Sequence, residues 1–140
     1  NFYSVIFHRL PEEELTPVLS DDAIEVLASP LKHLIPSIGL RMKFMEPQKT
    51  VACSSDTEPT EATVRLAQGA DILIHEASGG STGHSSAAQA GEIARQAGVK
   101  TLFLIHYPPN AAELDLLQPA RESFGGAAYL TTDRLQIILD

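Results

Sequence analysis

The chain has 140 residues, 44% of them hydrophobic and 20% charged, which is the size and composition of one globular domain and excludes an intrinsically disordered chain. The formal net charge is −8 and the lysines and arginines are scattered. The sequence therefore lacks the basic stripe that is typical of proteins that bind a nucleic-acid backbone. No apolar run approaches the roughly 20 residues of a membrane span, and the single cysteine, Cys53, excludes an internal disulfide and fits a reducing, cytoplasmic compartment.

The first third of the chain has the pattern of strands in succession. Residues 2–7 are β-branched and aromatic and predict a short strand, whereas the acidic, proline-punctuated residues 10–22 predict a loop. Residues 23–31 and 38–45 alternate apolar with polar side chains, which is the period of a half-buried strand. The short turn between them carries His33, and successive strands of this kind favour antiparallel pairing.

From residue 49 onward strands and helices alternate, which is the pattern of βαβ units and a parallel sheet. Ser86 and Gln89 have the spacing of a capping box, and Gly98 lies just past the end of the same helix. Residues 71–74 and 101–105 are so apolar that we expect strands buried on both faces. The predicted strands are 49–54, 71–74, 101–105, 127–130 and 135–139, and the predicted helices lie near 60–68, 86–98 and 114–124.

Polar side chains that could take part in catalysis or metal binding follow the apolar strands at the points where the strands end. They are Asp56, Glu76 and His106 after three successive strands, His84 where a glycine-rich loop enters a helix, and His33 in the earlier turn. Side chains at neighbouring strand ends meet at one edge of an α/β sheet, so we expect these groups to converge. Carboxylate and imidazole groups bind zinc or manganese. No HxH, HExxH or CxxC motif pairs them locally, so spacing alone leaves hydrogen-bonded structural histidines as the alternative.

Glu76 and His84 form a second candidate unit. A carboxylate at a strand end can orient an imidazole at the start of the next helix, and such a pair can transfer a proton. His75 points to the opposite face of the strand from Glu76, so we expect a core residue there. The loop G-G-S-T-G-H-S-S (residues 79–86) could bind an anion or simply be a well-capped loop, and no G-K-[ST] sequence makes it a Walker A loop.

Linked motifs in one order carry a resemblance to a known family. They are S-S-D-T-E-P (54–59), A-D-I-L-I-H-E-A (70–77), G-H-S-S (83–86), T-L-F-L-I-H-Y (101–107) and, before them, L-A-S-P-L-K-H-L-I-P-S-I-G-L-R-M (27–42). Together they resemble the C-terminal half of the metallo-β-lactamase superfamily, in the branch of the tRNA 3′-processing endonuclease, ribonuclease Z. The resemblance implies an α/β (α+β) fold: half of an αββα sandwich, with a mixed sheet and helices on one face.

The resemblance also implies roles for the five polar residues. His33, Asp56 and His106 match metal ligands, with Asp56 bridging two divalent ions, zinc by expectation and manganese as the alternative. Glu76 and His84 match a pair that donates a proton near the leaving group. The implied activity is hydrolysis of a phosphodiester by a dinuclear metal site.

Three features depart from the family pattern. The HxHxDH motif is absent, so we expect residues 1–140 to be a single domain, a fragment that lacks the N-terminal half and has little activity alone. The interval between His33 and Asp56 is too short for the arm that grips tRNA, and Tyr107-Pro108-Pro109 replaces a serine and an arginine–tyrosine pair. Together with the acidic charge, these differences argue against tRNA as the substrate.

Other functions therefore stay open. The substrate could be a small ester, a lactone or a sulfate ester, the domain could be a non-catalytic binding module, or an unrelated α/β domain could bind an anion at Gly83–Ser86. In a fragment of a sandwich the sheet face that the other half covers is exposed, so we expect the chain to associate into a homo-oligomer.

Overall fold

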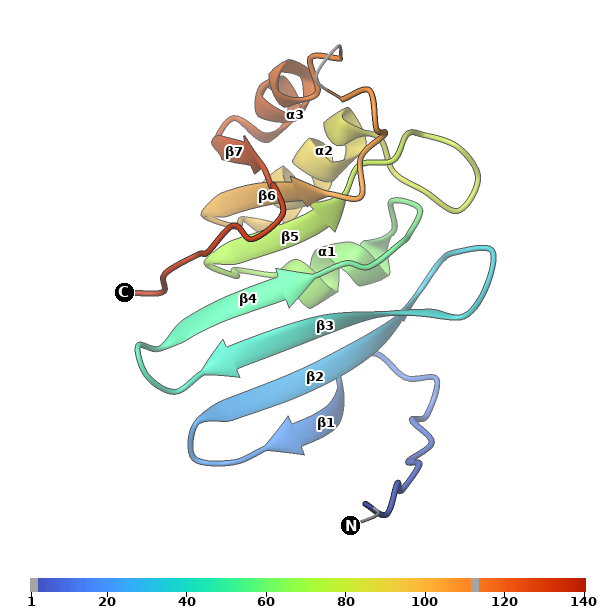
Figure 1. Ribbon diagram of the computed structural model, residues 1–140, viewed down its shortest axis with the longest axis vertical. Helices are drawn as coiled ribbons and strands as arrows, with labels where there is room; N and C mark the ends of the chain where they lie inside the picture. The colour runs from blue at the N-terminus through green and yellow to red at the C-terminus, as the bar shows by residue number, and fades with distance from the viewer. Residues whose placement is uncertain (1–2, 112–113) are drawn as a thin grey trace.

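The computed structural model describes residues 3–111 and 114–140, which form one mixed sheet packed against helices. The seven strands within these residues are β1 (Thr16–Ser20), β2 (Ile24–Leu31), β3 (Ser37–Phe44), β4 (Lys49–Cys53), β5 (Ile72–Glu76), β6 (Thr101–Ile105) and β7 (Ala127–Leu130). The helices are α1 (Glu61–Ala67), α2 (Ala87–Ala97) and α3 (Leu117–Phe124). The strands lie in the sheet in their order along the chain (Figure 1).

Strands β1 to β4 form an antiparallel meander. The period of two in residues 38–45 puts Met42 and Phe44 on the sheet face away from the helices. Arg41, on the other face, donates to the carbonyl oxygen of Leu66 in α1 at 2.8 Å. The two strands predicted on either side of the His33 turn, and their antiparallel pairing, are confirmed.

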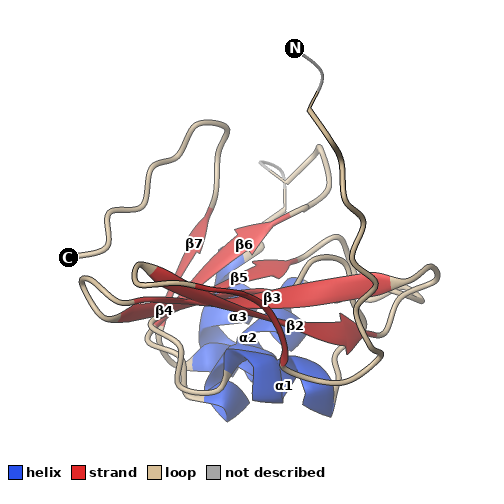
Figure 2. Cartoon of the chain, turned by 90° about the horizontal axis from the view of Figure 1, so that it is seen from below, coloured by secondary structure: helices blue, strands red, loops and turns tan. Residues whose placement is uncertain are grey.

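Strands β4 to β7 are parallel, and each crossover between them contains one helix. All the helices of the described residues lie on one side of the sheet, below it in Figure 2. The predicted fold class, a mixed sheet with helices on one face, is confirmed. Because parallel strands run in one direction, their carboxyl ends share one edge of the sheet.

Local sequence fixes the helix ends. The Ser86 hydroxyl accepts from the backbone N–H of Gln89 while the Gln89 side chain accepts from the N–H of Ser86, so the predicted capping box is confirmed. Gly98 ends α2 with a φ of 65°, the left-handed conformation that favours glycine. α1 begins after Thr60, whose hydroxyl accepts from the N–H of Thr63. Among residues 3–111 and 114–140, no helix is long and apolar enough to cross a membrane.

Small side chains let the helices approach the sheet and one another closely. The fully buried residues at the centre of the core include Ala90, Ala94 and Ala97 of α2 and Leu73, Leu102 and Leu104 of the central strands. Gly91 of α2 faces Ala120 of α3, and a methyl group on Gly91 would overlap the carbonyl oxygen of Ala120. The helix layer therefore depends on close shape complementarity as well as on burial.

The N-terminal segment differs from its prediction. Of the strand predicted at residues 2–7, residue 2 lies outside the described residues and residues 3–7 form no strand. Tyr3 and Phe7 are exposed, so they lack the packing that stabilises aromatic residues in a strand. The loop predicted at residues 10–22 is wrong in part, because β1 forms inside it by pairing with β2.

The C-terminal segment also differs. Residues 135–139, predicted as a strand, form none, and Leu139 instead lies beside Ile74 on the sheet face without helices. β6 is a strand as predicted but is not buried on both faces, since the fully buried Leu102 and Leu104 alternate with half-buried residues. The remaining predicted strands and helices are present, with shifts at their ends.

The close approach at Gly91 predicts an unusual response to alanine. At an exposed helix position Gly→Ala stabilises by about 1 kcal/mol, but here the added methyl group meets the α3 backbone. We expect Gly91→Ala to lower the free energy of unfolding by about 1–3 kcal/mol, seen as a lower urea midpoint. Gly80→Ala is the control, because its methyl group would meet side-chain atoms at 3.3 Å or more and no backbone atom closely. A Gly91→Ala protein as stable as the parent would contradict the prediction.

Candidate functional site

The five polar residues singled out in the sequence lie at one edge of the sheet. His33 follows β2, Asp56 follows β4, Glu76 ends β5, His106 follows β6, and His84 lies in the loop between β5 and α2. β2 and β4 both pair antiparallel with β3, so they run in the same direction, and β5 and β6 run parallel to β4. The carboxyl ends of all four strands therefore meet at this edge.

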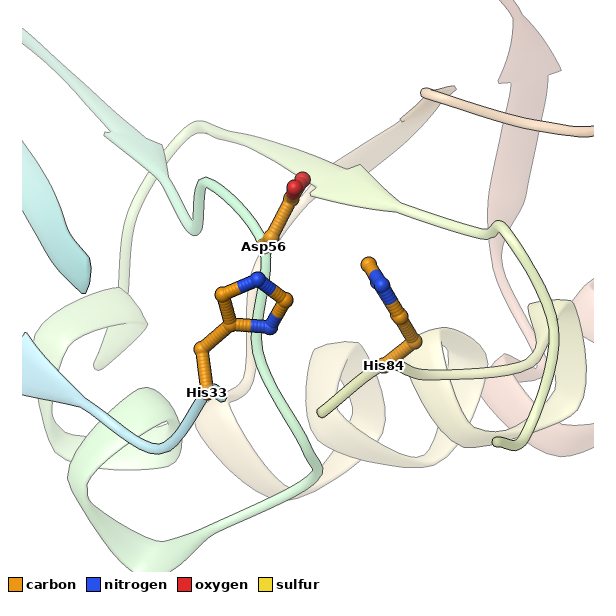
Figure 3. Close-up of side chains that lie close together, drawn as sticks. All are labelled: His33, Asp56 and His84. Atoms are coloured by element: carbon orange, nitrogen blue, oxygen red, sulfur yellow. The ribbon is translucent and has the colours of Figure 1, made fainter. Parts of the chain in front are cut away.

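The side chains converge on His84. Figure 3 shows His33, Asp56 and His84 side by side, although each comes from a different loop. The potential ligand atoms of these three residues lie within 4.8 Å of one another, and those of Glu76, His84 and His106 do as well. The imidazole ring of His84 lies 4.8 Å from that of His33 and 5.7 Å from that of His106, measured between centroids. The structure thus brings together all five residues.

Asp56 and His106 form the exposed part of the cluster. The Nδ1 atom of His106 lies 2.7 Å from Oδ1 of Asp56, and the two side chains are 51% and 38% exposed, so a ligand can reach both. Ser55, directly before Asp56, and His106 itself have left-handed backbones, with φ of 50° and 46°. Such conformations cost on the order of 1–3 kcal/mol each and often occur at functional sites. Here they turn the chain sharply where β4 and β6 end.

Hydrogen bonds at Nδ1 orient the other two imidazoles. Nδ1 of His33 lies 2.6 Å from the carbonyl oxygen of Gly83, and Nδ1 of His84 lies 3.1 Å from Oε1 of Glu76. A carbonyl or carboxylate oxygen can only accept, so each Nδ1 carries the proton and Nε2 is the nitrogen left for a ligand. Metal-binding histidines commonly donate their second ring N–H to such an acceptor.

Glu76 is a fully buried carboxylate with donors from two loops, the one after β4 and the one after β5. Its Oε1 accepts from the N–H groups of Ser85 at 2.8 Å and Thr57 at 3.3 Å, as well as from His84. Its Oε2 accepts from the N–H and the hydroxyl of Ser78, both at 2.9 Å. Since charge-assisted bonds of this kind are strong, Glu76 fixes the ring of His84 and the loops on either side.

His75 lies on the opposite face of β5, in the core, where the strand alternation predicted it. Its Nδ1 donates to the carbonyl oxygen of Glu76 at 2.8 Å, and its Nε2 is buried with no hydrogen-bond partner among the described residues. Complete burial lowers the pKa of His75, because the charged form loses its hydration. His75 is therefore a neutral structural residue at neutral pH.

Sequence reasoning missed the residues that tie the loops together. The Ser37 hydroxyl donates to the carbonyl oxygen of Asp56, and the Ser85 hydroxyl to that of Thr57, at 2.8 and 2.7 Å. The Glu58 carboxylate accepts from the N–H of Gly83 at 3.0 Å. These partners are 19 to 28 residues apart in the chain, and no local pattern signals such pairs. The only feature of the sequence that could have pointed to Ser37, Glu58 and Ser85 is that they lie within the family motifs.

The donor set fits a divalent metal ion. Imidazole nitrogens from His33, His84 and His106 and carboxylate oxygens from Asp56 are the ligand types that zinc prefers, and manganese accepts them as well. The hydrogen bonds at Nδ1 already aim two of the imidazoles.

Comparison with known proteins agrees with this geometry. The sequence profile of the beta-lactamase superfamily domain matches residues 5–107. The chain belongs to the metallo-β-lactamase superfamily. Its relatives in this superfamily include the ribonuclease Z of Exiguobacterium sibiricum, which is 38% identical over 94% of this chain and 52% of the relative. The ribonuclease Z of Brevibacillus brevis is 41% identical over 50% of this chain and 24% of the relative. The chain thus spans about half of the length of the first relative and about a quarter of the second. The predicted resemblance is confirmed.

A solved structure supports the fold of the superfamily. The metallo-beta-lactamase fold protein YhfI from Bacillus subtilis superposes with a TM-score of 0.73 and 24% identity, over 82% of this chain and 49% of that protein. At this identity the likeness shows the shared fold.

The buried His75 predicts a pH dependence of stability. Its pKa in the folded protein lies below the ordinary value of 6.5, so the unfolded chain binds a proton first as the pH falls. The stability from the neutral ring is complete above pH 6.5 and decreases below it, by about 1.4 kcal/mol per pH unit until the folded-state pKa is reached. We expect His75→Gln to flatten this slope in urea titrations from pH 7 to about pH 5. His8→Gln, at an exposed histidine, should leave the slope unchanged. A slope that survives in His75→Gln would disprove the assignment.

Proposed function

We propose that this chain supplies metal ligands and a proton-transfer pair to a metal-dependent hydrolase that cleaves phosphodiesters, as in the ribonuclease Z branch of the superfamily. One observation carries the proposal: His33, Asp56, Glu76, His84 and His106, from five separate segments, converge at one sheet edge with their potential ligand atoms in two overlapping groups. Structural histidines satisfied by local hydrogen bonds would not need to gather in this way.

In this proposal His33, Asp56 and His106 hold two divalent ions, zinc by preference and manganese as the alternative. Asp56 would be the ligand shared by the two ions, because its carboxylate lies within reach of both His33 and His106. When bound by these residues, such ions would supply the Lewis acidity that activates water and stabilises negative charge on a phosphate. Asp56 and His106 are half-exposed, so the substrate phosphate can approach from solvent.

Glu76 and His84 deliver the proton to the leaving group. Glu76 accepts from Nδ1 of His84, which holds the ring in one orientation. Nε2 of His84 then faces the cluster and can donate to the leaving oxygen. Because the Glu76 carboxylate is fully buried and saturated with donors, it acts through His84 and does not itself reach the substrate.

The three ligands His33, Asp56 and His106 do not complete a dinuclear site, since zinc in proteins usually takes about four ligands per ion. We propose that an HxHxDH segment outside residues 1–140 supplies the remaining ligands. The share of the ribonuclease Z relatives that this chain spans, 52% and 24%, supports this division. Residues 1–140 are then the C-terminal half of the sandwich, in a reducing, cytoplasmic protein, and have little activity alone.

For the substrate we propose an RNA phosphodiester, because the relatives are named ribonuclease Z. A second candidate is a small phosphodiester. It is favoured by the net charge of −8 and by Asp133, which lines a cavity together with His106. Acidic groups there repel a polyanion more than they repel a single phosphate. Comparing a 3′-extended tRNA with bis(p-nitrophenyl) phosphate decides between the two.

Loss of the bridging carboxylate tests the function. We expect Asp56→Ala, in the longest natural chain that contains these residues, to lower phosphodiester hydrolysis by more than about 100-fold, since even outer partners of metal ligands are worth 10–100-fold. The zinc content, measured by mass spectrometry, should fall as well. Asp133→Asn is the control and should retain zinc. A parent chain without zinc, together with no loss of activity on Asp56→Ala, would favour a non-catalytic binding module.

The sheet face without helices predicts self-association of the isolated chain. On it the rings of Phe103 and Tyr129 stack at 5.4 Å between centroids, and Tyr129 is 48% exposed. We propose that two copies of the 140-residue chain associate through this face, giving a dimer mass in light scattering. Tyr129→Lys should shift the mass toward a monomer, whereas Gln96→Lys on the exposed side of α2 should not. A monomer at millimolar concentration would be inconsistent with this association.

A further inference from the structure

The side chain of Glu58 lies where three loops of the site meet. Its own loop, after β4, also carries Asp56. Its Oε2 lies 2.6 Å from Nζ of Lys32 in the β2–β3 turn, and its Oε1 accepts from the N–H of Gly83 in the glycine-rich loop at 3.0 Å. Its backbone N–H also donates to the carbonyl oxygen of Lys32 at 2.7 Å. Glu58 thus connects three loops of the site. These loops carry His33, Asp56 and His84, whose side chains are drawn in Figure 3.

Gly83 links Glu58 to His33. The N–H of Gly83 donates to Glu58, and its carbonyl oxygen accepts from Nδ1 of His33 at 2.6 Å. Gly83 has a φ of +87°, and a Cβ atom there would lie 2.8 Å from Nδ1 of His33 and 3.0 Å from Cγ of Leu34. Only glycine fits this close approach, so the position of the Gly83 backbone directly sets the direction of the His33 ring.

A closed ring of contacts results. It runs from Glu58 through Lys32 to its chain neighbour His33, across to Gly83 and back to Glu58. The Lys32 amine is 67% exposed, and an ion pair so exposed contributes little. The bond from the Gly83 N–H to a partly buried carboxylate is the stronger link, because a charged acceptor strengthens it.

We infer that Glu58 is a positioning residue: by holding the Gly83 backbone, it fixes His33 in the Nδ1–H tautomer with Nε2 directed into the cluster. Two carboxylates thus orient two different histidines. Glu76 accepts directly from His84, whereas Glu58 acts on His33 through the backbone of Gly83. The pKa of the Glu58 carboxyl is lowered by the hydrogen bonds from Lys32 and from the Gly83 N–H, so the acceptor is charged at neutral pH. The inference rests on the proposed function only in giving His33 a metal to bind.

The test uses the full chain in two states. In the metal-free protein, ¹⁵N NMR of the histidine side chains reads the tautomer of His33, which we expect to be Nδ1–H in the parent. Glu58→Ala should shift it to a mixture. Glu58→Gln keeps an acceptor for the Gly83 N–H and should restore the parent tautomer, whereas Lys32→Met, which removes only the ion pair, should leave it unchanged.

Zinc affinity, measured by competition with a chelator, is the second readout. We expect Glu58→Ala to weaken zinc binding about 10–100-fold, the usual effect of losing a group that orients a metal ligand. Glu58→Gln should recover most of this loss. Urea unfolding of all variants separates orientation from stability, because a purely structural Glu58 would lower the midpoint without changing the tautomer of the folded protein.

The outcomes separate this inference from the proposed function. An unchanged His33 tautomer in Glu58→Ala overturns the positioning role, whatever happens to metal binding. Loss of the Nδ1–H tautomer together with weaker zinc binding supports it. If the tautomer changes but neither Glu58→Ala nor His33→Ala weakens zinc binding, the positioning role stands and the metal role proposed for His33 fails.

Discussion

The buried carboxylate of Glu76 is the constraint on which the arrangement of the site depends. A carboxylate taken out of water is costly unless hydrogen bonds compensate it. Its donors come from the loop after β4, through Thr57, and from the loop after β5, through Ser78, His84 and Ser85. To supply them, both loops must fold inward over the end of β5. Asp56 and His84 approach each other because their chain neighbours, Thr57 and Ser85, both donate hydrogen bonds to the Glu76 carboxylate.

The strand directions explain why one edge of the sheet can collect so many groups. The strands that carry site residues at this edge are β2, β4, β5 and β6, and the antiparallel β3 lies between the first two. The antiparallel half thus contributes His33 and the parallel half contributes Asp56, Glu76 and His106. The helices pack on the far side of the central strands, where Leu73 and Leu102 are fully buried, so the loops at the edge are free to form the site.

Sequence alone predicted the elements whose signals are local and missed those that need distant partners. An apolar strand followed by a polar residue is a pattern of a few neighbouring positions, and it located Asp56 and His106. The capping box of Ser86 and Gln89 is local in the same way. Residues 3–7 have a strand composition but no strand partner among the described residues, and β1 forms in a stretch that looks like a loop because β2 offers it an edge. Glu58 was missed for the same reason, since its partner Gly83 is 25 residues away in the chain.

The three histidines are oriented by different means, and the difference bears on their chemistry. His33 and His84 are held at Nδ1 by a backbone carbonyl and by the buried Glu76, neither of which is free to move. Nδ1 of His106 is instead held by Asp56, which is itself a candidate ligand. A contact that a metal ion can rearrange cannot fix the ring. The direction of His106 must come from its backbone, whose left-handed φ of 46° turns the chain where β6 ends.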